Sequence, residues 1–184
     1  GIWNTPPETI FALCEEMQKQ GIQMHIHTHG DEASEVSIAA IEAAGRKHPW
    51  PSARHVLQHC QMMGRDQFRK CADMGICTNI FSNHIWYFGD RHAELTIGEE
   101  RAMRMDAARA ALDEGVRVAI HSDAPVTPMG PLFTAWCAVA RETMSGRVLG
   151  EAQRITTEEA LYAITLGAAY TLKLDHEIGS IEAG

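Results

Sequence analysis

Three histidines at alternate positions, His25, His27 and His29, form the stretch of this chain with the clearest capacity for chemistry. They follow a short apolar run and precede a Gly-Asp step. Successive side chains of a strand point to opposite faces, so alternate residues share one face. Imidazole is also the commonest metal ligand among the side chains. The stretch therefore indicates a strand that runs into a metal or catalytic site.

Two later segments end in the same manner. Residues 55–59 are a short strand-like segment that ends in His59, and residues 115–120 run directly into the sequence that carries Asp123. In parallel α/β folds the chemistry lies at the carboxyl ends of the strands, where the connecting loops converge. We therefore expect His27, His59 and Asp123 to meet at one centre.

Two imidazoles and one carboxylate are a donor set that suits zinc and, less specifically, iron, manganese or nickel. Such a set leaves coordination positions open for water and substrate. A metal of this kind lowers the pKa of a bound water to about 7 and so supplies a nucleophile at neutral pH. Iron oxygenases use the same donor set, but the alternation of strands and helices in this chain disfavours that class. The expected cofactor is a divalent metal, most of all zinc.

Each of these residues also has an ordinary structural interpretation. A histidine at a strand end more often makes a hydrogen bond than binds a metal, and Asp123 could cap a helix or stabilise a turn. His25 is expected in a barrel interior, one layer below His27. His29 and His121 are expected near the mouth, where either could contact substrate or orient a metal ligand.

The elements that position these residues follow from capping and periodicity. Thr5 is the expected N-cap of a first helix that Gly21 ends, because Pro6 suits the first helical position and Glu8 closes a capping box. Further helices are expected at 31–45, 65–74, 99–114 and 131–144, with another capped by residues 156–159 and continuing through 165–170. Strands are expected at 22–27, 55–59, 75–79 and 115–120.

Strands that alternate with helices indicate a parallel sheet with right-handed crossovers, of the doubly wound or barrel type. Four such units amount to half of a (β/α)₈ barrel, whose typical length is about 250 residues. The segment 79–98 shows neither helical nor strand periodicity and is rich in aromatic residues. We expect it to be a loop that walls or covers a pocket, and it carries His84 and His92, which could reach that pocket.

The 184 residues suit one domain, residues 1–184. A net charge of −8 disfavours nucleic acid as a partner, and no apolar run approaches the roughly 20 residues that cross a bilayer. The five cysteines form no CxxC pair, which is typical of reduced thiols in a cytoplasmic protein. The expected partner is a small-molecule substrate.

The same segments resemble a known family. Residues 21–31 resemble the fifth-strand signature of the amidohydrolase superfamily, in the branch that includes N-substituted formamide deformylases. Residues 54–61 are similar to its sixth-strand motif R-H-x-x-E-H-x-Q, and residues 122–126 to its eighth-strand S-D-A-P-V. Residues 158–169 and 179–184 are similar to the C-terminal region of that branch. The resemblance covers nearly the whole chain, in the order of the family.

The resemblance implies roles for particular residues. His27 and His59 would be metal ligands, and Asp123 would be both a ligand and the general base that takes a proton from the nucleophilic water. The implied reaction is hydrolysis of a C–N bond other than a peptide bond. Trp86 and Arg141 stand where the branch tends to carry such residues, so both are candidates for substrate binding, and Trp86 is expected to line the pocket.

Two features of the family have no match in this chain, the His-x-His pair of the first strand and the lysine of the fourth. The chain is therefore expected to correspond to the C-terminal half of such a barrel, roughly strands five to eight. A half barrel leaves sheet edges and apolar surface exposed, which predicts self-association or pairing with a missing N-terminal half. The alternative is a folded, catalytically inactive module with a structural or interaction role.

Overall fold

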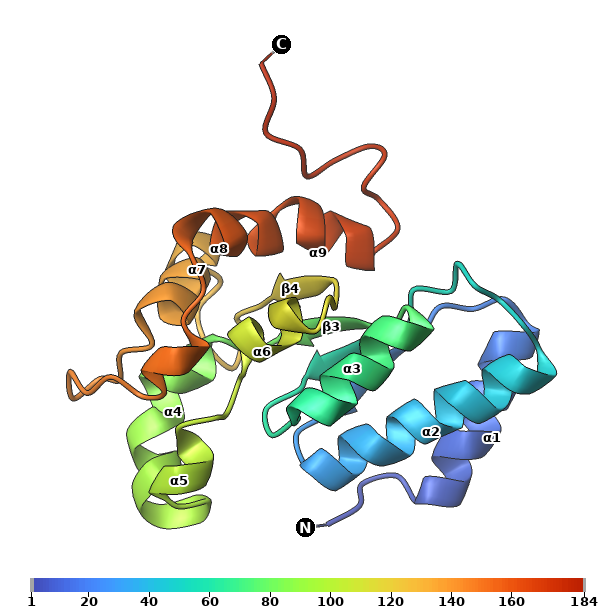
Figure 1. Ribbon diagram of the computed structural model, residues 1–184, viewed down its shortest axis with the longest axis horizontal. Helices are drawn as coiled ribbons and strands as arrows, with labels where there is room; N and C mark the ends of the chain where they lie inside the picture. The colour runs from blue at the N-terminus through green and yellow to red at the C-terminus, as the bar shows by residue number, and fades with distance from the viewer. Residues whose placement is uncertain (1, 184) are drawn as a thin grey trace.

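Four short parallel strands form one sheet in chain order, as the computed structural model of residues 2–183 shows (Figure 1). The strands are β1 (His25–Thr28), β2 (Val56–His59), β3 (Cys77–Ile80) and β4 (Val118–Ile120). Their register places Thr28 opposite His59, His59 opposite Ile80, and Ile80 opposite Ile120. The four strands therefore end in one row, which brings the segments that follow them to a common edge.

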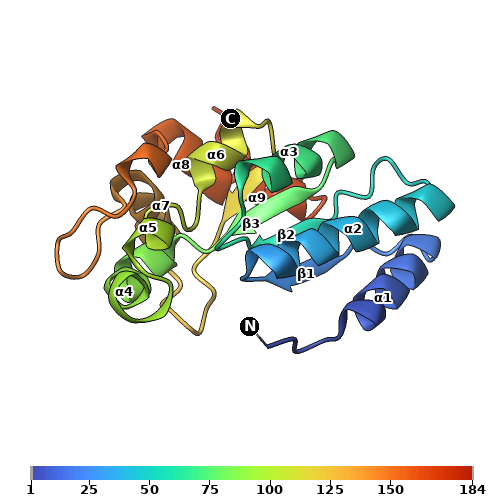
Figure 2. The same cartoon turned by 60° about the horizontal axis from the view of Figure 1, so that its bottom comes forward.

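The helices occupy the connections between the strands and the region after β4. They are α1 (Pro7–Lys19), α2 (Asp31–Lys47), α3 (Arg65–Met74), α4 (Asn83–Arg91), the π-helix η1 (His92–Thr96), α5 (Glu99–Ala102), α6 (Ala108–Asp113), α7 (Pro131–Ala140), the 3₁₀ turn η2 (Glu151–Gln153), α8 (Thr157–Ile164) and α9 (Leu166–Thr171). In both views α4, α5 and α7 group together beyond one end of the sheet, and α1 lies beside α2 (Figures 1 and 2). The expected mixed α/β fold with a parallel sheet is confirmed.

The main core lies between the sheet and the helices that cover it. Leu57, Phe68 and Ile80 are fully buried there. Strand β1 is different, because within the described residues it pairs only with β2, and its exposed residues His25 and His27 alternate with the half-buried Ile26 and the buried Thr28. The predicted strand at 22–27 was wrong about its start, because Ile22 lies before the strand and is half exposed, and β1 begins at His25 as an edge strand.

Of the two helix N-caps predicted from the sequence, at Thr156 and Thr5, one is confirmed. Thr156 accepts a hydrogen bond from the backbone N–H of Glu159, and the Glu159 carboxylate accepts one from the backbone N–H of Thr156, so the predicted cap of α8 is confirmed. The predicted cap at Thr5 was wrong, because Pro6 is the N-cap of α1 and no side chain caps it. A residue before proline avoids the helical conformation, and Pro6 precedes Pro7.

Two predicted elements were wrong for tertiary reasons. The expected helix at 99–114 is divided into α5 and α6, and between them Asp106 is buried with a left-handed φ of 49°. The backbone N–H of Asp106 donates to the carbonyl of Gln61 at 2.9 Å. That contact between distant segments fixes a conformation that the local sequence, rich in Ala and Arg, does not favour.

The segment 79–98 was expected to be a loop and is largely helical, forming α4 and η1. Helix α4 buries Asn83, His84, Ile85 and Gly89. A helix that is buried on more than one side lacks a simple apolar stripe, and for this reason its periodicity was not visible.

None of the described helices combines the length and the hydropathy that a membrane span needs.

Candidate metal centre

The ring of His59 reaches the centre through an unusual backbone conformation. His59 has φ 68° and Cys60 has φ 55°, in the left-handed region that few residues other than glycine adopt. Asp123, which follows β4, has φ 53°. Such conformations cost on the order of 1–3 kcal/mol each and cluster at functional sites. Two of the three predicted ligands are therefore held in strained positions at the carboxyl edge of the sheet.

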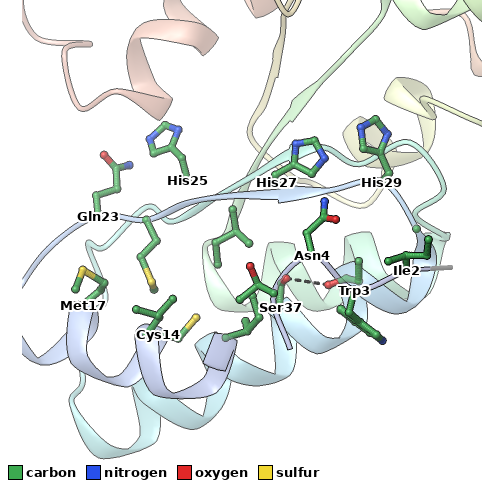
Figure 3. A pocket seen from close by; sticks show the side chains of 17 residues that line it. Ile2, Trp3, Asn4, Cys14, Met17, Gln23, His25, His27, His29 and Ser37 are labelled. Atoms are coloured by element: carbon green, nitrogen blue, oxygen red, sulfur yellow. Dashed lines mark hydrogen bonds between the residues drawn. The ribbon is translucent and has the colours of Figure 1, made fainter. Parts of the chain in front are cut away.

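Three imidazoles meet at this edge, those of His27 in β1, His29 just after β1 and His59 at the end of β2. The ring centroids of His27 and His59 are 4.4 Å apart, those of His27 and His29 are 4.6 Å apart, and the rings of His29 and His59 stack at 4.6 Å. One ligand nitrogen from each ring lies within 4.8 Å of the others. Figure 3 shows His25, His27 and His29 pointing to the same side of β1. The expected convergence of strand-end histidines is thus present.

A second group of possible ligands lies on the β4 side and consists of His59, His121 and Asp123, whose ligand atoms also lie within 4.8 Å of one another. The ring centroids of His59 and His121 are 4.8 Å apart. His59 belongs to both groups. The predicted ligand set of His27, His59 and Asp123 therefore spans two adjoining groups that meet at His59.

The electrostatics of the cluster favour the neutral form of His29, His59 and His121. Burial, reinforced by the neighbouring histidines, lowers the pKa of His59 to about 2. Burial also lowers the pKa of His121 to about 4 and lowers the pKa of His29 below its ordinary value. A neutral imidazole has a free lone pair, which is the form that binds a metal.

Two ring nitrogens of the cluster have no hydrogen-bond partner among the described residues. They are Nδ1 of His59 and Nε2 of His121, and both are buried. An unpaired buried polar atom costs about 1–3 kcal/mol, so each such atom in a folded protein calls for an explanation. The neutral imidazole of His59, with an unsatisfied nitrogen and with other imidazoles and the Asp123 carboxylate in its two ligand groups, belongs to a donor set that fits a divalent metal ion.

Polar side chains around the cluster make hydrogen bonds to its histidines. The Gln61 side chain connects two histidines, with Oε1 2.9 Å from His29 Nδ1 and Nε2 3.2 Å from His92 Nε2. His84, the other histidine of the 79–98 segment, lies 3.2 Å from the Asp106 carboxylate. The sequence indicated that His84 and His92 could reach the pocket. It carried no signal for Asp106, and Gln61 was visible only as part of a strand motif.

His25 points to the same side of the strand as His27 (Figure 3). Its Nδ1 is 2.8 Å from the Gln58 amide nitrogen, and the Gln58 amide oxygen accepts a hydrogen bond from Asn79 at 2.8 Å. These three side chains form a polar ladder across β1, β2 and β3. His25 itself is exposed, because it lies on the edge strand.

Arg141 makes its hydrogen bonds away from the two ligand groups, and its role in substrate binding stays a prediction. Its side chain is fully buried and donates hydrogen bonds to the carbonyls of Leu149, Asp106 and Met105 at 2.8, 3.0 and 2.8 Å. It thereby holds the irregular segment between α5 and α6. Arg141 also has φ 50°, which ends α7 before the predicted limit at Met144.

Trp86 lies in α4, two positions after His84, and so on the far side of a helix with 3.6 residues per turn. Its ring packs edge-on against Trp136 and Phe133, with centroids 5.3 and 5.9 Å away. These contacts join α4 to α7. The expectation that Trp86 lines the pocket stays a prediction.

A cavity of about 780 Å³ follows β1 on its free edge, between the strand, the N-terminal segment and α1 (Figure 3). Its lining includes His27 and His29 together with apolar side chains such as Cys14 and Met17, but not His59. The imidazoles point away from Cys14 and Met17 in Figure 3. The cavity therefore adjoins the cluster from the edge of the sheet.

The sequence profile of the amidohydrolase family matches residues 2–184. The chain belongs to this family. It is 33% identical over 177 residues to an N-substituted formamide deformylase of Arthrobacter pascens, a match that covers 95% of this chain and 32% of that protein. The chain thus spans about a third of the length of this amidohydrolase.

Solved structures show the same fold. A metal-dependent hydrolase from Pyrococcus horikoshii OT3 superposes with a TM-score of 0.81 at 21% identity, over 99% of this chain and 36% of that one. An adenosine deaminase from Xanthomonas campestris with bound zinc gives a TM-score of 0.66 at 20% identity, over 98% of this chain and 39% of that one. The expected architecture, part of a (β/α)₈ barrel, is confirmed.

Proposed function

We propose that this amidohydrolase chain carries part of the active site of a metal-dependent hydrolase that cleaves a C–N bond other than a peptide bond in a small molecule. The proposal assigns His27 and His59 as metal ligands and Asp123 as a ligand and general base. The observation that carries it is the convergence of these residues, from three different strand ends, around the unsatisfied imidazole of His59. The likeness to an N-substituted formamide deformylase supports the C–N bond as the target.

A divalent metal bound here, most of all zinc, would lower the pKa of a bound water to about 7 and polarise a substrate carbonyl. The remaining chemistry belongs to the side chains. Asp123 accepts the proton of the nucleophilic water and returns it to the leaving nitrogen, as a general base and then a general acid. The backbone N–H of Asp123 donates to Nδ1 of His121 at 3.1 Å, which fixes the loop that carries the carboxylate.

Metal analysis of purified protein tests the ligands directly. We expect about one equivalent of zinc or a similar ion in the wild type and loss of that metal in His27→Ala and His59→Ala. His176→Ala is the matched control, because His176 is exposed and lies outside both ligand groups. Unchanged metal content in the His27 and His59 variants would remove the ligand assignment.

The alternative function, a folded module without activity of its own, is favoured by the span of the chain, which covers about a third of its curated relative. Hydrolysis of N-substituted formamides, other amides and cyclic amides separates the two. Turnover by the 184-residue chain would exclude the inactive module. Turnover only after a polypeptide with the complementary barrel strands is added would support it.

We also propose that residues 1–184 form a single domain that associates with another copy or with a complementary half barrel. Strands β1 and β4 each have one partner among the described strands, and an unpaired strand edge favours association. A stable, non-aggregating monomer at micromolar concentration in analytical ultracentrifugation would contradict this. All five cysteines are free and buried, which supports a proposed cytoplasmic location.

A further inference from the structure

A chain of hydrogen bonds behind the cluster determines which nitrogen of His92 carries its proton. The Gln61 amide nitrogen, which only donates, lies 3.2 Å from His92 Nε2, so that ring nitrogen accepts, and the Thr96 hydroxyl lies 2.8 Å from His92 Nδ1. His92 is therefore protonated at Nδ1. Its Nε2 is left with a lone pair, and that lone pair faces Gln61.

The orientation of the Gln61 amide also determines which ring nitrogen of His29 carries its proton. An amide nitrogen only donates and an amide oxygen only accepts. The Gln61 amide nitrogen therefore donates to His92 Nε2, and its oxygen accepts from His29 Nδ1. Gln61 is 7% exposed, so water competes little for these bonds. His29 is consequently protonated at Nδ1, and its Nε2 has a free lone pair.

His121 carries its proton on the other ring nitrogen from His29. The backbone N–H of Asp123 donates to Nδ1 of His121, so the proton of a neutral His121 lies on Nε2. That Nε2 is buried and has no hydrogen-bond partner among the described residues. His121 thus presents an N–H group to its surroundings, whereas His29 presents a lone pair.

We propose that His29 is a third imidazole ligand of the centre, beside His27 and His59, and that Gln61 is the positioning residue that sets its tautomer. The proposal rests on the proposed function, because it concerns the same metal. Zinc takes both histidine nitrogens and carboxylate oxygens as ligands, so a third imidazole is compatible with Asp123 at the same ion. Metal-binding histidines generally donate their other ring N–H to an oxygen acceptor, and here the Gln61 amide oxygen is that acceptor.

The test measures the affinity of the metal-free 184-residue chain for Zn²⁺ by competition with a chromophoric chelator, and the visible absorption of its Co²⁺ complex. His29→Asn is the sharpest variant, because asparagine keeps a donor for Gln61 and lacks the distal nitrogen. We expect its affinity to fall by more than the roughly 10–100-fold that loss of a supporting partner costs. We also expect a changed Co²⁺ spectrum.

Gln61→Leu removes the acceptor for His29 and should lower Zn²⁺ affinity by about 10–100-fold. Gln61→Glu keeps an acceptor oxygen and should restore most of that affinity, a rescue that a merely structural role would not produce. Gln153→Leu is the matched control, because Gln153 accepts a hydrogen bond from Ala110 outside both ligand groups. Thermal unfolding of each metal-free variant verifies that it folds.

The outcomes separate this inference from the proposed function. If His29→Asn and Gln61→Leu fold and bind Zn²⁺ as the wild type does, while His27→Ala and His59→Ala lose it, the third ligand is overturned and the proposed centre stands. If the His27 and His59 variants also keep their affinity, both are overturned. Equal losses in Gln61→Leu and Gln61→Glu would overturn the positioning role of Gln61.

Discussion

Two histidines at opposite ends of the β2 segment share their burial but not their hydrogen bonding. His55 precedes the strand and is 3% exposed, and His59 ends it and is 4% exposed. Burial lowers the pKa of both, to about 4 for His55 and about 2 for His59. Neither burial nor the direction of the pKa shift therefore distinguishes a structural histidine from a functional one.

The hydrogen bonds make the distinction. Nδ1 of His55 accepts from the backbone N–H of Met24 at 3.1 Å, and Nε2 lies 2.6 Å from the Gln18 amide oxygen. Both nitrogens of His55 are thus satisfied within the fold. Nδ1 of His59 is buried and unpaired, and the His59 backbone is strained. A buried polar group that the fold leaves unsatisfied indicates a ligand, and a satisfied one indicates structure.

The largest expected effect follows from changing His59. We expect His59→Gly to lower Zn²⁺ affinity by at least about 100-fold, since it removes the residue common to both ligand groups. Glycine adopts positive φ without strain, and this relief offsets part of the cost of the cavity that the lost ring leaves, so the free energy of unfolding of the metal-free variant should stay close to that of the wild type. Chelator competition and urea unfolding measure the two quantities. A strongly destabilised metal-free variant would make His59 structural and remove the contrast with His55.

Arg141 extends the comparison to a buried cation with satisfied hydrogen bonds. Arg141→Met should lower the free energy of unfolding by about 3 kcal/mol or more, because three buried carbonyls lose a charged donor. Urea unfolding measures this loss. A variant of wild-type stability whose affinity for a substrate is reduced would instead support the predicted role of Arg141 in substrate binding.

His55→Ala should destabilise the protein by about 2 kcal/mol, because Gln18 and the Met24 N–H lose their partner. The same variant should bind Zn²⁺ with wild-type affinity. This pair of results is the reverse of that expected for His59→Gly. Loss of metal from a folded His55→Ala protein would show that the two histidines are not separate in function.

The smallest effect concerns pH. The folded pKa of His55 is about 4, below its ordinary value of 6.5, so between these values the unfolded chain binds more protons than the folded one. The stability that His55 contributes is complete above pH 6.5 and is lost as the pH falls toward 4. The metal-free wild type should therefore lose more stability between pH 7 and pH 5 than His55→Ala does, as urea titrations would show. Equal losses would exclude this contribution.

Local signals predicted some elements well. Helix α3 has the expected limits, and the Thr156–Glu159 capping box forms as expected. The strands were placed in the right order but begin one to three residues later than expected, because burial and pairing rather than composition decide where a strand starts. The break at Asp106 and the helix α4 were missed, since both depend on contacts between segments far apart in the chain.

The sequence alone determined that His27, His59 and Asp123 lie at the ends of three of the four strand segments, because alternation and capping are local and parallel strands bring their ends together. Only the tertiary structure decided the backbone conformation of these residues and the hydrogen bonds of the imidazoles around them. The left-handed backbone at His59 and the Gln61–His92 hydrogen bonds arise from packing between distant segments. The direction of those hydrogen bonds determines which imidazoles offer a lone pair. A pattern of residue types cannot predict the direction of these hydrogen bonds. Each histidine has two ring nitrogens, and the groups that surround it in the folded protein determine which of the two carries the proton.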